Sequence, residues 1–512
     1  MRLQELIHDL GLTLVRGDGQ TELSDLADDS RRVTSGSLFV ARDTGDDRWR
    51  SFVNDAVGRG AAAVIAPGNT ELPESVALAV GGDDEQARVD QAMAGRLAGR
   101  FFDNPAAKLK LVGVTGTNGK TTVATLTQHL LNAAGVKCGL LGTVSIDHGA
   151  PDGPQAAELT TPGAIDLHRY FAAMVEHGCV ACAMEVSSHA LDQRRVDGLG
   201  FDAAVFTNLT QDHLDYHGTM EDYAAAKAKL FRHVRPGGRA VLPRSDPAAL
   251  TMLAEIGSMV TVVWTSTDLT AVRSQDYRLI PEGLTPTGSR SRFGGGNRPD
   301  CDVNVPLIGE HNLRNLVQAI AAAEAVQMFP EDTLRDAVGS CRPVPGRLEP
   351  VTLDRTDVPM VLVDYAHTPD ALDNVLRAVR PIARSRLICV FGCGGDRDRT
   401  KRPLMAAAAV RLADRAYLTS DNPRTEDPQR ILDDAYAGVP EEKCPIVSVI
   451  ADRREAIRRA VLDADARDMV LIAGKGHEDY QVLGTQKIHF DDREEAAAAL
   501  AERATNPRGG EA

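Results

Sequence analysis

A regular alternation of short apolar runs and helical segments constrains this chain more than any other feature. From about residue 109 onward, strands are predicted at Leu109–Thr115, Cys138–Val144, Cys179–Val186 and Ala203–Asn208, with helices such as Thr121–Ala134 between them. Strands separated by helices pair in parallel, because each helix returns the chain to the same end of the sheet. The sequence therefore predicts an α/β fold with a mainly parallel sheet covered by helices.

The alternation restarts near Pro345, which divides the chain into segments. A length of 512 residues is too great for a single core at about 150 residues per domain. Residues 1–107 mix short strands with helices and end at Asp103-Asn-Pro-Ala106, where proline disfavours helical geometry in the residue before it. We therefore expect three domains: a smaller N-terminal α/β domain (1–107), a central domain (108–344) and a C-terminal domain (345–512). Later strands are predicted at Met360–Asp364, Leu387–Phe391, Arg415–Thr419, Ile446–Ile450 and Val470–Ala473.

Two segments are predicted to lie outside the regular structure. Gly288–Asn297 is rich in glycine, serine and arginine, which favours a surface loop without a contribution to a core. Glu502–Ala512 is expected to be a frayed C-terminal tail.

Composition excludes several classes of function. The formal charge of −15 opposes binding to nucleic acid, and no run approaches the roughly 20 apolar residues that span a bilayer. The first residues lack the basic start and apolar run of a signal peptide. Eight cysteines in so long a chain indicate reduced thiols, including the pair Cys179 and Cys182 within an apolar run. We expect a cytoplasmic protein.

A glycine-rich segment marks the point where a strand passes into a helix. Gly113-Val-Thr-Gly-Thr-Asn-Gly-Lys-Thr-Thr122 allows the backbone to curl around an anion, and the helix that follows points its amides at the same place. Lys120 can reach the β and γ phosphates of a nucleotide, and the Thr121 hydroxyl can bind Mg²⁺. The usual phosphate-binding pattern has glycine where this chain has Val114, so the cradle is a variant.

Candidate metal ligands follow the next two strands. Glu185 ends the Cys179–Val186 strand and is placed as a Mg²⁺ carboxylate at the carboxyl edge of the sheet. Thr207–His217 leaves the following strand and carries His213 and His217. A helix with Lys227 comes next, although residue type alone would favour a solvated lysine there.

Taken together and in order, these motifs resemble the Mur ligases of the peptidoglycan pathway over nearly the whole chain. The resemblance is closest to the members that add meso-diaminopimelate to UDP-N-acetylmuramoyl-L-alanyl-D-glutamate. It is carried by the cradle and by a series of short motifs. These are Asp29-Ser-Arg31, Thr160-Thr-Pro162, Glu185–His189, Asp212–His217, Lys227, Gly309-Glu-His-Asn312, Pro345-Gly-Arg347, Asp364-Tyr-Ala-His-Thr-Pro369, Gly392-Cys-Gly-Gly-Asp-Arg-Asp398, Asp421-Asn-Pro-Arg424 and Gly474-Lys-Gly-His-Glu478.

The resemblance implies a UDP-sugar-binding first domain, a P-loop ATPase-like central domain and a Rossmann-like, amino-acid-binding third domain. It implies that ATP converts a carboxylate into an acyl phosphate, which the amine of diaminopimelate then attacks. The expected partners are these small molecules only, ATP, UDP-N-acetylmuramoyl-dipeptide and meso-diaminopimelate, with no nucleic acid and no membrane span. The chain is expected to be a monomer.

The resemblance also assigns nucleotide and metal sites. Mg²⁺ ligands are expected at Thr121, Glu185, His213 and Lys227, the last as a carbamate derived from CO₂. Lys120, His213, Lys227 and Arg347 are expected to act in catalysis, with Arg347 on the nucleotide phosphates. The nucleotide contacts are expected at Gly116, Thr117, Asn118, Gly119, Lys120, Thr121, Thr122 and, for adenine, Asn312.

The resemblance also implies which residues contact the substrates. For the nucleotide sugar, the matching positions are Ser30, Thr160, Thr161, Ser187, Gln193 and Arg195. The loop Arg42–Trp49 departs from the family's pattern, so its contacts with uracil are left open. For diaminopimelate, the matching positions are Arg397, Asp421, Asn422, Pro423, Arg424, Gly474 and Glu478. Arg424 can bind a carboxylate through two parallel hydrogen bonds, which suits the carboxylate that distinguishes diaminopimelate from lysine.

Four alternatives are weighed against this interpretation. A sister ligase that adds L-lysine would share the chemistry and differ at the arginine of Asp421–Arg424. A folylpolyglutamate-synthase-like ligase should lack the first hundred residues. A nucleotide-binding regulator without catalysis should have lost Lys120, Glu185 or Lys227, and a P-loop motor should offer a surface for a nucleic acid or a filament.

Overall fold

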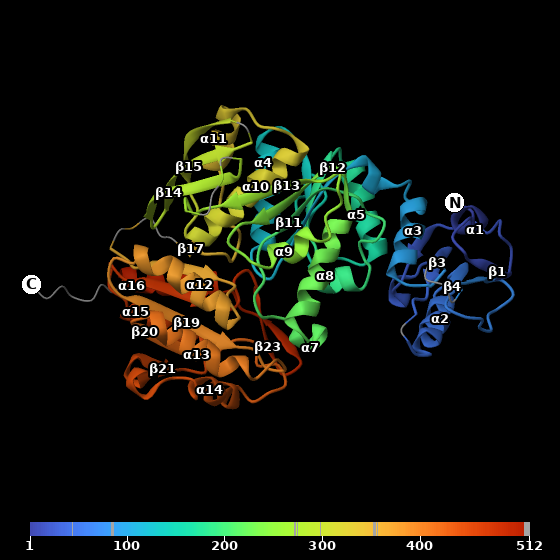
Figure 1. Cartoon of the computed structure of the whole chain (residues 1–512). Coiled ribbons are helices and arrows are strands. Elements are labelled where there is room, and N and C mark those ends of the chain that lie inside the picture. Colours follow the sequence, from blue (N-terminus) through green and yellow to red (C-terminus); the bar gives the residue numbers. More distant parts are fainter. Residues whose placement is uncertain are drawn as a thin grey trace, which may run out of the picture. The chain divides into compact units, whose positions relative to one another are not determined.

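The computed structural model describes residues 1–43, 45–82, 87–270, 273, 275–296, 298–351, 355 and 357–505. The chain forms two compact units, which are described separately below. Unit 1 comprises 1–264 and 318–329, and unit 2 comprises 265–317 and 330–512. Figure 1 shows the elements in sequence colours.

The first sheet of unit 1 is built from the N-terminal residues. Its strand order is β1-β5-β4-β3-β2, and all pairs are parallel except β1 with β5. The strands are β1 (Thr13–Arg16), β2 (Asp25–Ala27), β3 (Ser37–Val40), β4 (Ala63–Ala66) and β5 (Ala77–Val80). Helices α1 (Leu3–Ile7) and α3 (Gln91–Phe101) pack on one face and α2 (Arg48–Gly58) on the other, so both faces are buried.

The second sheet of unit 1 carries the glycine-rich segment. Along it the order is β12-β11-β6-β10-β7-β8-β9, and β12 to β7 are parallel. The strands are β6 (Lys110–Thr115), β7 (Cys138–Leu141), β8 (Ser145–Asp147), β9 (Gln155–Ala156), β10 (Ala181–Glu185), β11 (Phe201–Phe206) and β12 (Val234–Pro243). The helices are α4 (Lys120–Ala133), α5 (Ala164–Glu176), α6 (Ser188–Asp192), α7 (Leu214–His217), α8 (Met220–Arg232) and α9 (Ala249–Leu253). Because β6 lies between β10 and β11, the cradle is at the centre of this sheet.

The prediction of a surface loop at Gly288–Asn297 is wrong for the residues that the structure describes. Gly288–Gly295 forms strand β15, which pairs antiparallel with β14 (Tyr277–Thr285) and β16 (Arg298–Val305). Ser289, Ser291 and Phe293 alternate with exposed arginines and are buried, with Phe293 fully enclosed. The sequence did not predict this strand because glycine and serine obscure the alternation of buried and exposed side chains that a strand with one buried face requires. Helix α11 (Glu331–Gly339) packs against β16.

Two further elements belong partly to unit 2. Strand β13 (Thr261–Ser266) pairs in parallel with β14 through Thr265 and Ser266. Helix α10 (Glu310–Val326) begins in unit 2 and contains the predicted adenine contact, Asn312.

The C-terminal sheet of unit 2 has the order β17-β18-β22-β19-β20-β21, parallel except for β17. Its strands are β17 (Glu349–Val351), β18 (Met360–Asp364), β19 (Leu387–Cys393), β20 (Arg415–Ser420), β21 (Val447–Val449) and β22 (Met469–Ala473). One face is covered by α12 (Pro369–Val379), α13 (Lys401–Leu412) and α14 (Pro428–Tyr436), and the other by α15 (Arg453–Asp463) and α16 (Asp492–Thr505). A hairpin of β23 (Tyr480–Leu483) and β24 (Gln486–His489) follows β22.

The α/β class with mainly parallel sheets is confirmed, while the residue limits of the three domains stay predictions. Helix α16 extends through Thr505, so the expected tail is helical over 502–505; its remainder lies outside the described residues. All eight cysteines are free thiols. Among the helices that the structure describes, none is long and apolar enough to cross a membrane.

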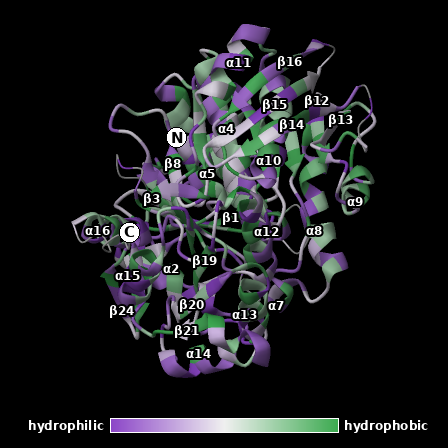
Figure 2. Cartoon of the chain, turned by 90° about the vertical axis from the view of Figure 1, so that its left-hand side faces the viewer, coloured by the Kyte–Doolittle hydropathy of each residue, from purple (hydrophilic) through white to green (hydrophobic). Residues whose placement is uncertain are grey.

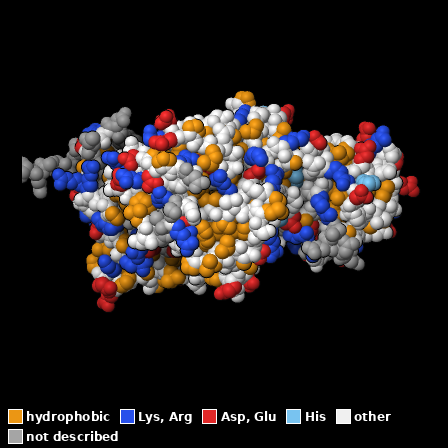
Figure 3. Space-filling model, turned by 45° about the horizontal axis from the view of Figure 1, so that its top comes forward, with side chains coloured by type: hydrophobic (Ala, Val, Ile, Leu, Met, Phe, Trp, Pro, Cys, Tyr) orange, Lys and Arg blue, Asp and Glu red, His pale blue; other side chains and the backbone are white. Residues whose placement is uncertain are grey.

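Hydrophilic and charged side chains are prominent on the surface of the structure. Figure 2 shows hydrophilic purple turns on outer helices such as α11 and α14, as expected where only one stripe of a helix is buried. In Figure 3, basic and acidic side chains are intermixed on the face in view.

Candidate active site

The cradle is the turn between β6 and α4. Gly116 and Gly119 have φ angles of 145° and 86°, which side chains disfavour. At Gly116 a Cβ atom would lie 1.9 Å from Thr207 Oγ1, so this position requires glycine. The other predicted nucleotide contacts lie in the same turn and in the first turn of α4; they are Thr117, Asn118, Lys120, Thr121 and Thr122.

The cradle is fixed by the loop after β11. Asn208 accepts a hydrogen bond from Thr117 N through its carbonyl oxygen (2.9 Å) and from Asn118 N through Oδ1 (3.0 Å). Its Nδ2 donates to Asn118 O at 3.0 Å, and Thr207 Oγ1 donates to the same oxygen at 2.6 Å. Sequence analysis assigned Asn208 no role, although its place directly after a strand beside β6 was a usable signal.

Two predicted catalytic lysines meet at one carbonyl of this turn. Lys120 Nζ donates to Gly116 O (3.0 Å) and Thr117 O (2.8 Å). Lys227, which comes from α8, donates to Gly116 O at 2.8 Å. The sequence places these residues more than a hundred positions apart, and the fold brings both amines to the phosphate cradle.

Lys227 is enclosed. Its side chain is 1% exposed, and Nζ lies 4.1 Å from the centre of the Tyr223 ring. Burial holds the pKa of Lys227 well below its usual range, and the neighbouring charge of Lys120 lowers it further, while Asp212 opposes the shift. The nearby Lys229 instead lies at the surface and pairs with Asp192 at 2.9 Å. Lys227 is therefore set up to be a neutral amine.

Glu185 is held at the carboxyl end of β10. It is 1% exposed, and its two carboxylate oxygens accept from Thr143 N (2.7 Å) and Thr143 Oγ1 (3.1 Å). Gly142 permits this approach, since a Cβ there would lie 2.7 Å from Glu185 Oε1. Thr143 was missed by sequence analysis and orients the predicted metal carboxylate.

His213 stands at the start of α7 in the left-handed region (φ 53°). Its ring centre is 4.9 Å from that of His189, and His217 is 5.5 Å from His189. Desolvation and nearby cationic groups lower the pKa of His213, which favours the neutral ring that a metal needs. His217 instead bonds Ser188 Oγ at 2.9 Å.

The donor set fits a hard cation with incomplete protein coordination. No group of three His, Cys, Asp or Glu side chains suited to a metal occurs among the described residues. The predicted set contains only Glu185 and His213 of those types, beside the buried hydroxyl of Thr121 and the amine of Lys227. Magnesium commonly takes one or two protein carboxylates and completes its shell with water and phosphate oxygens, so the residues fit Mg²⁺ with a nucleotide.

Most of the predicted nucleotide-sugar residues gather around the end of β10. Thr161 Oγ1 donates to Glu185 O (3.0 Å), and Arg195 Nη1 donates to Thr161 O (2.7 Å). Arg195 also donates to Gln193 Oε1 at 2.7 Å. Thr160 Oγ1 lies 3.1 Å from Thr143 Oγ1, and Ser187 caps α6.

Ser30 is the exception within this set. It lies after β2 in the N-terminal sheet, and its hydroxyl helps to lower the pKa of Asp55 on α2. Arg42, in the loop that departs from the family's pattern, pairs with Asp28 at 3.0 Å. Burial, and then the charge of Arg42, lower the pKa of Arg195.

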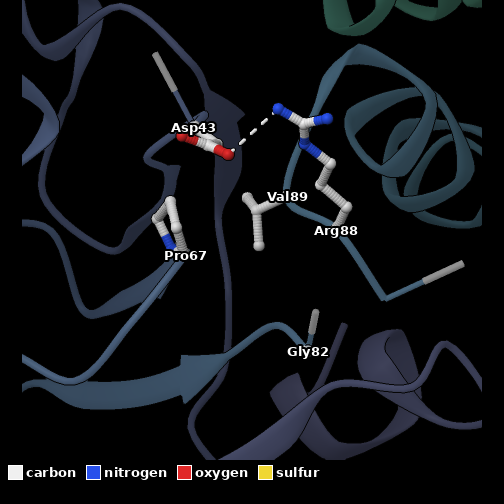
Figure 4. Close-up of a pocket in the computed structure, with 5 residues that line it drawn as sticks. All are labelled: Asp43, Pro67, Gly82, Arg88 and Val89. Atoms are coloured by element: carbon white, nitrogen blue, oxygen red, sulfur yellow. Dashed lines mark hydrogen bonds and ion pairs between the residues drawn. The ribbon is translucent and has the colours of Figure 1, made fainter. Parts of the chain in front are cut away.

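That atypical loop also borders a small pocket of about 230 Å³ in the N-terminal sheet. Figure 4 shows its lining, which includes the ion pair between Arg88 and Asp43 (3.2 Å). Pro67, Gly82 and Val89 complete the lining.

In unit 2, the two predicted nucleotide contacts have separate surroundings. Asn312 is buried and donates from Nδ2 to Ile308 O at 2.8 Å, within the start of α10. Arg347 lies over the Tyr365 ring at 4.6 Å. A Cβ at Gly346 would lie 2.1 Å from His477 N, so this turn can approach the His477 segment only with glycine.

The predicted amino-acid site lies at the carboxyl edge of the C-terminal sheet. Asp421 and Asn422 follow β20, and Gly474 follows β22 with a φ of 123°. A Cβ at Gly474 would lie 2.6 Å from Asp421 Oδ2. Asn422 Nδ2 donates to Glu478 Oε2 at 3.0 Å. The structure thus brings together four of the seven predicted residues in direct contact.

Arg424 completes this edge after Pro423. Its backbone is in the left-handed region (φ 53°) and is held by β23, because Arg424 N donates to Val482 O (3.1 Å). Its guanidinium donates to Gly395 O at 2.7 Å. Both Arg424 and the exposed Arg397 flank Gly394, so the two arginines border the same turn.

Two protein-family models match separate parts of the chain. Residues 114–323 match the Mur ligase middle domain, and residues 346–476 match the Mur ligase, glutamate ligase domain.

Several relatives are similar over almost the full chain. A UDP-N-acetylmuramoyl-L-alanyl-D-glutamate–2,6-diaminopimelate ligase of Synechococcus elongatus is 48% identical over 94% of both chains. The protein of the same name from Thermosynechococcus vestitus is 46% identical over 95% of both. A solved structure of a ligase with that name is similar at 33% identity and a TM-score of 0.67, covering 98% of this chain and 99% of the other.

Proposed function

Because this chain belongs to the Mur ligase family, we propose that it is the ATP-dependent ligase that joins meso-2,6-diaminopimelate to UDP-N-acetylmuramoyl-L-alanyl-D-glutamate. This reaction is a step in the synthesis of peptidoglycan precursors. The observation that carries the choice of amino acid is the contact of Asp421, Asn422 and Glu478 beside an arginine, Arg424, at one edge of the sheet.

The reaction must turn a poor electrophile into a good one. The γ-phosphoryl group of ATP passes to the glutamyl carboxylate, which gives ADP and an acyl phosphate. The neutral amine of diaminopimelate attacks the acyl carbon, phosphate leaves, and a proton is released, so that one amide forms for each ATP. Several anionic groups meet in this process, and cationic groups provide the largest stabilisation.

The residues of the cradle divide this task. The backbone of Gly116–Gly119 and the start of α4 surround the phosphates, and the Lys120 amine exchanges its carbonyl partners for phosphate oxygens. Thr121, Glu185 and His213 would hold Mg²⁺, which would supply charge neutralisation at the phosphates. The neutral amine of Lys227 would add to CO₂ and release a proton, and the resulting carbamate would offer an anionic oxygen to the same metal. Burial of that amine and its low pKa support this assignment.

Selection of the amino acid depends on Arg424. Diaminopimelate carries a distal carboxylate that lysine lacks, and a guanidinium can bind a carboxylate bidentately. With lysine in the site, Arg424 would be desolvated without an anion, which disfavours lysine by about 2 to 5 kcal/mol. Arg397 is the proposed partner of a further carboxylate, and Asp421 and Glu478 receive an ammonium group.

The wider organisation is part of the same proposal. Residues 1–107 bind the UDP-sugar, 108–344 bind ATP, and 345–512 bind the amino acid. Arg347 contacts the nucleotide phosphates and Asn312 the adenine. We assign the protein to the cytoplasm, where its substrate ATP is available, and expect it to act as a monomer.

The deciding experiment compares amino acids. Purified protein with ATP, Mg²⁺ and UDP-N-acetylmuramoyl-L-alanyl-D-glutamate should release phosphate when meso-diaminopimelate is added, with a product of the corresponding mass. L-Lysine should support a rate lower by about 30-fold or more. Equal use of L-lysine would assign the protein to the lysine-adding ligases instead.

A further inference from the structure

A second buried lysine lies in unit 2, and the mechanism above gives it no task. Lys475 follows Gly474 after β22, and its side chain is 0% exposed. A lysine is almost never fully buried unless its charge is paired. Its surroundings therefore have to explain why it is there.

The hydrogen-bond and ion-pair partners of Lys475 are all residues assigned to the amino acid. Its Nζ donates to Asn422 Oδ1 at 3.1 Å. It lies 3.7 Å from Asp421 Oδ1 and 3.6 Å from Glu478 Oε2. One ammonium group thus contacts three neighbouring side chains that come from two different loops.

Other charges close to this cluster are already engaged. Arg453 is fully buried, pairs with Asp492 at 2.6 Å and donates to Ala473 O at 3.0 Å. Tyr365, Tyr480, Arg453 and Cys393 also interact electrostatically with carboxylates of the cluster. Arg424 directs its guanidinium to Gly395 O. Lys475 is therefore the cation in direct contact with both carboxylates.

We propose that Lys475 is a positioning residue, whose ammonium group holds the Asp421 and Glu478 carboxylates together so that they can receive an ammonium group of the incoming amino acid. Two carboxylates that share a site repel each other unless a cation lies between them. Lys475 supplies that cation and, through Asn422, also fixes the turn that leads to Arg424. This inference rests on the proposed function.

The first test is Lys475→Met, which keeps the length of the side chain and removes its charge. We expect KM for meso-diaminopimelate to rise about 30- to 100-fold, with KM for ATP and for the UDP-dipeptide changed less than about threefold. Lys487→Met is the matched control, because Lys487 is exposed and lies 3.7 Å above the same Tyr480 ring that Lys475 approaches at 5.6 Å. The control should be nearly silent. A rise in all three KM values together would overturn the proposal.

A double-mutant cycle with Glu478→Gln completes the test. If Lys475 acts through Glu478, adding Lys475→Met to Glu478→Gln should raise KM by less than about threefold, far below its effect in the wild type. If the two substitutions instead raise KM by factors that multiply, Lys475 has an independent packing role, and the inference is overturned. If Lys475→Met does not fold, the double variant decides, since removing both charges should restore folding, and its failure to do so counts against the proposal.

Failure of this inference can be distinguished from failure of the proposed function. If the wild-type protein proves to use L-lysine, the proposed substrate is wrong. The same double-mutant cycle can then be measured with L-lysine, because its ammonium groups can also bind to the two carboxylates.

Discussion

The two buried lysines of this protein have opposite surroundings. Lys227, in unit 1, is 1% exposed and bonds the carbonyl of Gly116, to which the cationic Lys120 also donates. Lys475, in unit 2, is 0% exposed and lies within 3.7 Å of the carboxylates of Asp421 and Glu478. The residue type and the degree of burial are the same, and only the neighbours differ.

The difference shows how a fold decides the chemical role of a side chain. Burial next to another cation disfavours the ammonium form, so Lys227 is available as a nucleophilic amine for CO₂. Burial next to two carboxylates instead makes Lys475 a group that organises its neighbours. The following predictions test this contrast, beginning with the largest expected effect.

Removing Lys227 should abolish most of the activity. Lys227→Ala is expected to lower kcat by about 10²- to 10³-fold, because the metal site loses an anionic ligand where negative charge is transferred. Short carboxylic acids should restore part of the rate by occupying the vacated position. Phosphate release, measured with and without added acetate or propionate, provides the readout.

Lys229→Ala is the control for this variant. Lys229 lies two residues away on the same helix, at the surface, with Asp192 as its partner. It should be nearly silent, and full activity of Lys227→Ala without an added acid would contradict the proposed role.

The same substitution should change stability differently at the two lysines. Lys475→Met leaves two nearly buried carboxylates without their cation and should lower the free energy of unfolding by about 3 to 5 kcal/mol. Lys227→Met removes one hydrogen bond and a poorly solvated amine, so its effect should stay within about 1 kcal/mol. Chemical unfolding of both variants beside the wild type measures the two values. Equal losses would mean that the surroundings of the two amines do not differ as described.

Arg424 extends the contrast to substrate choice. Arg424→Ala should lower kcat/KM for meso-diaminopimelate by about 100-fold, because the distal carboxylate loses its partner, and should change KM for ATP by less than about threefold. Steady-state kinetics with both substrates checks this. Arg430→Ala, an exposed arginine of α14, serves as the control. A loss that falls equally on ATP would place Arg424 outside the amino-acid site.

The smallest effect concerns the protonation state of Lys227. Enzyme that has been depleted of CO₂ is reactivated at a fixed concentration of bicarbonate, which reacts with the Lys227 amine to give the carbamate and water. If the amine is already neutral, this reaction neither takes up nor releases a proton. Because the pKa of Lys227 is lowered, the extent of reactivation should rise less steeply between about pH 7.5 and about pH 9 than it would for an ordinary lysine. An ordinary lysine would be protonated there, and reactivation would rise about tenfold per pH unit. Such a rise would show that Lys227 is an ammonium group in the folded protein.

Much of the candidate site could be predicted from local pattern. The turn Gly116–Gly119, the carboxylate of Glu185 and the turn after β20 all stand at strand ends, and parallel strands present those ends at one edge. The supporting residues could not be found in this way. Thr143, Asn208 and Lys475 act through contacts with distant parts of the chain, and their residue types are common on any surface.

The sequence by itself predicted the α/β class and the alternation of strands and helices in its central and C-terminal parts, because these depend on periodicity. Its motifs, and the family that they resemble, offered candidate groups for binding phosphate, metal and carboxylate. Tertiary structure alone decided that Gly288–Gly295 is a half-buried strand, that Lys227 is buried beside the amine of Lys120, and that Lys475 is buried beside two carboxylates. Burial and charge proximity depend on which distant segments pack together, and a pKa or a strand with one buried face follows from that packing.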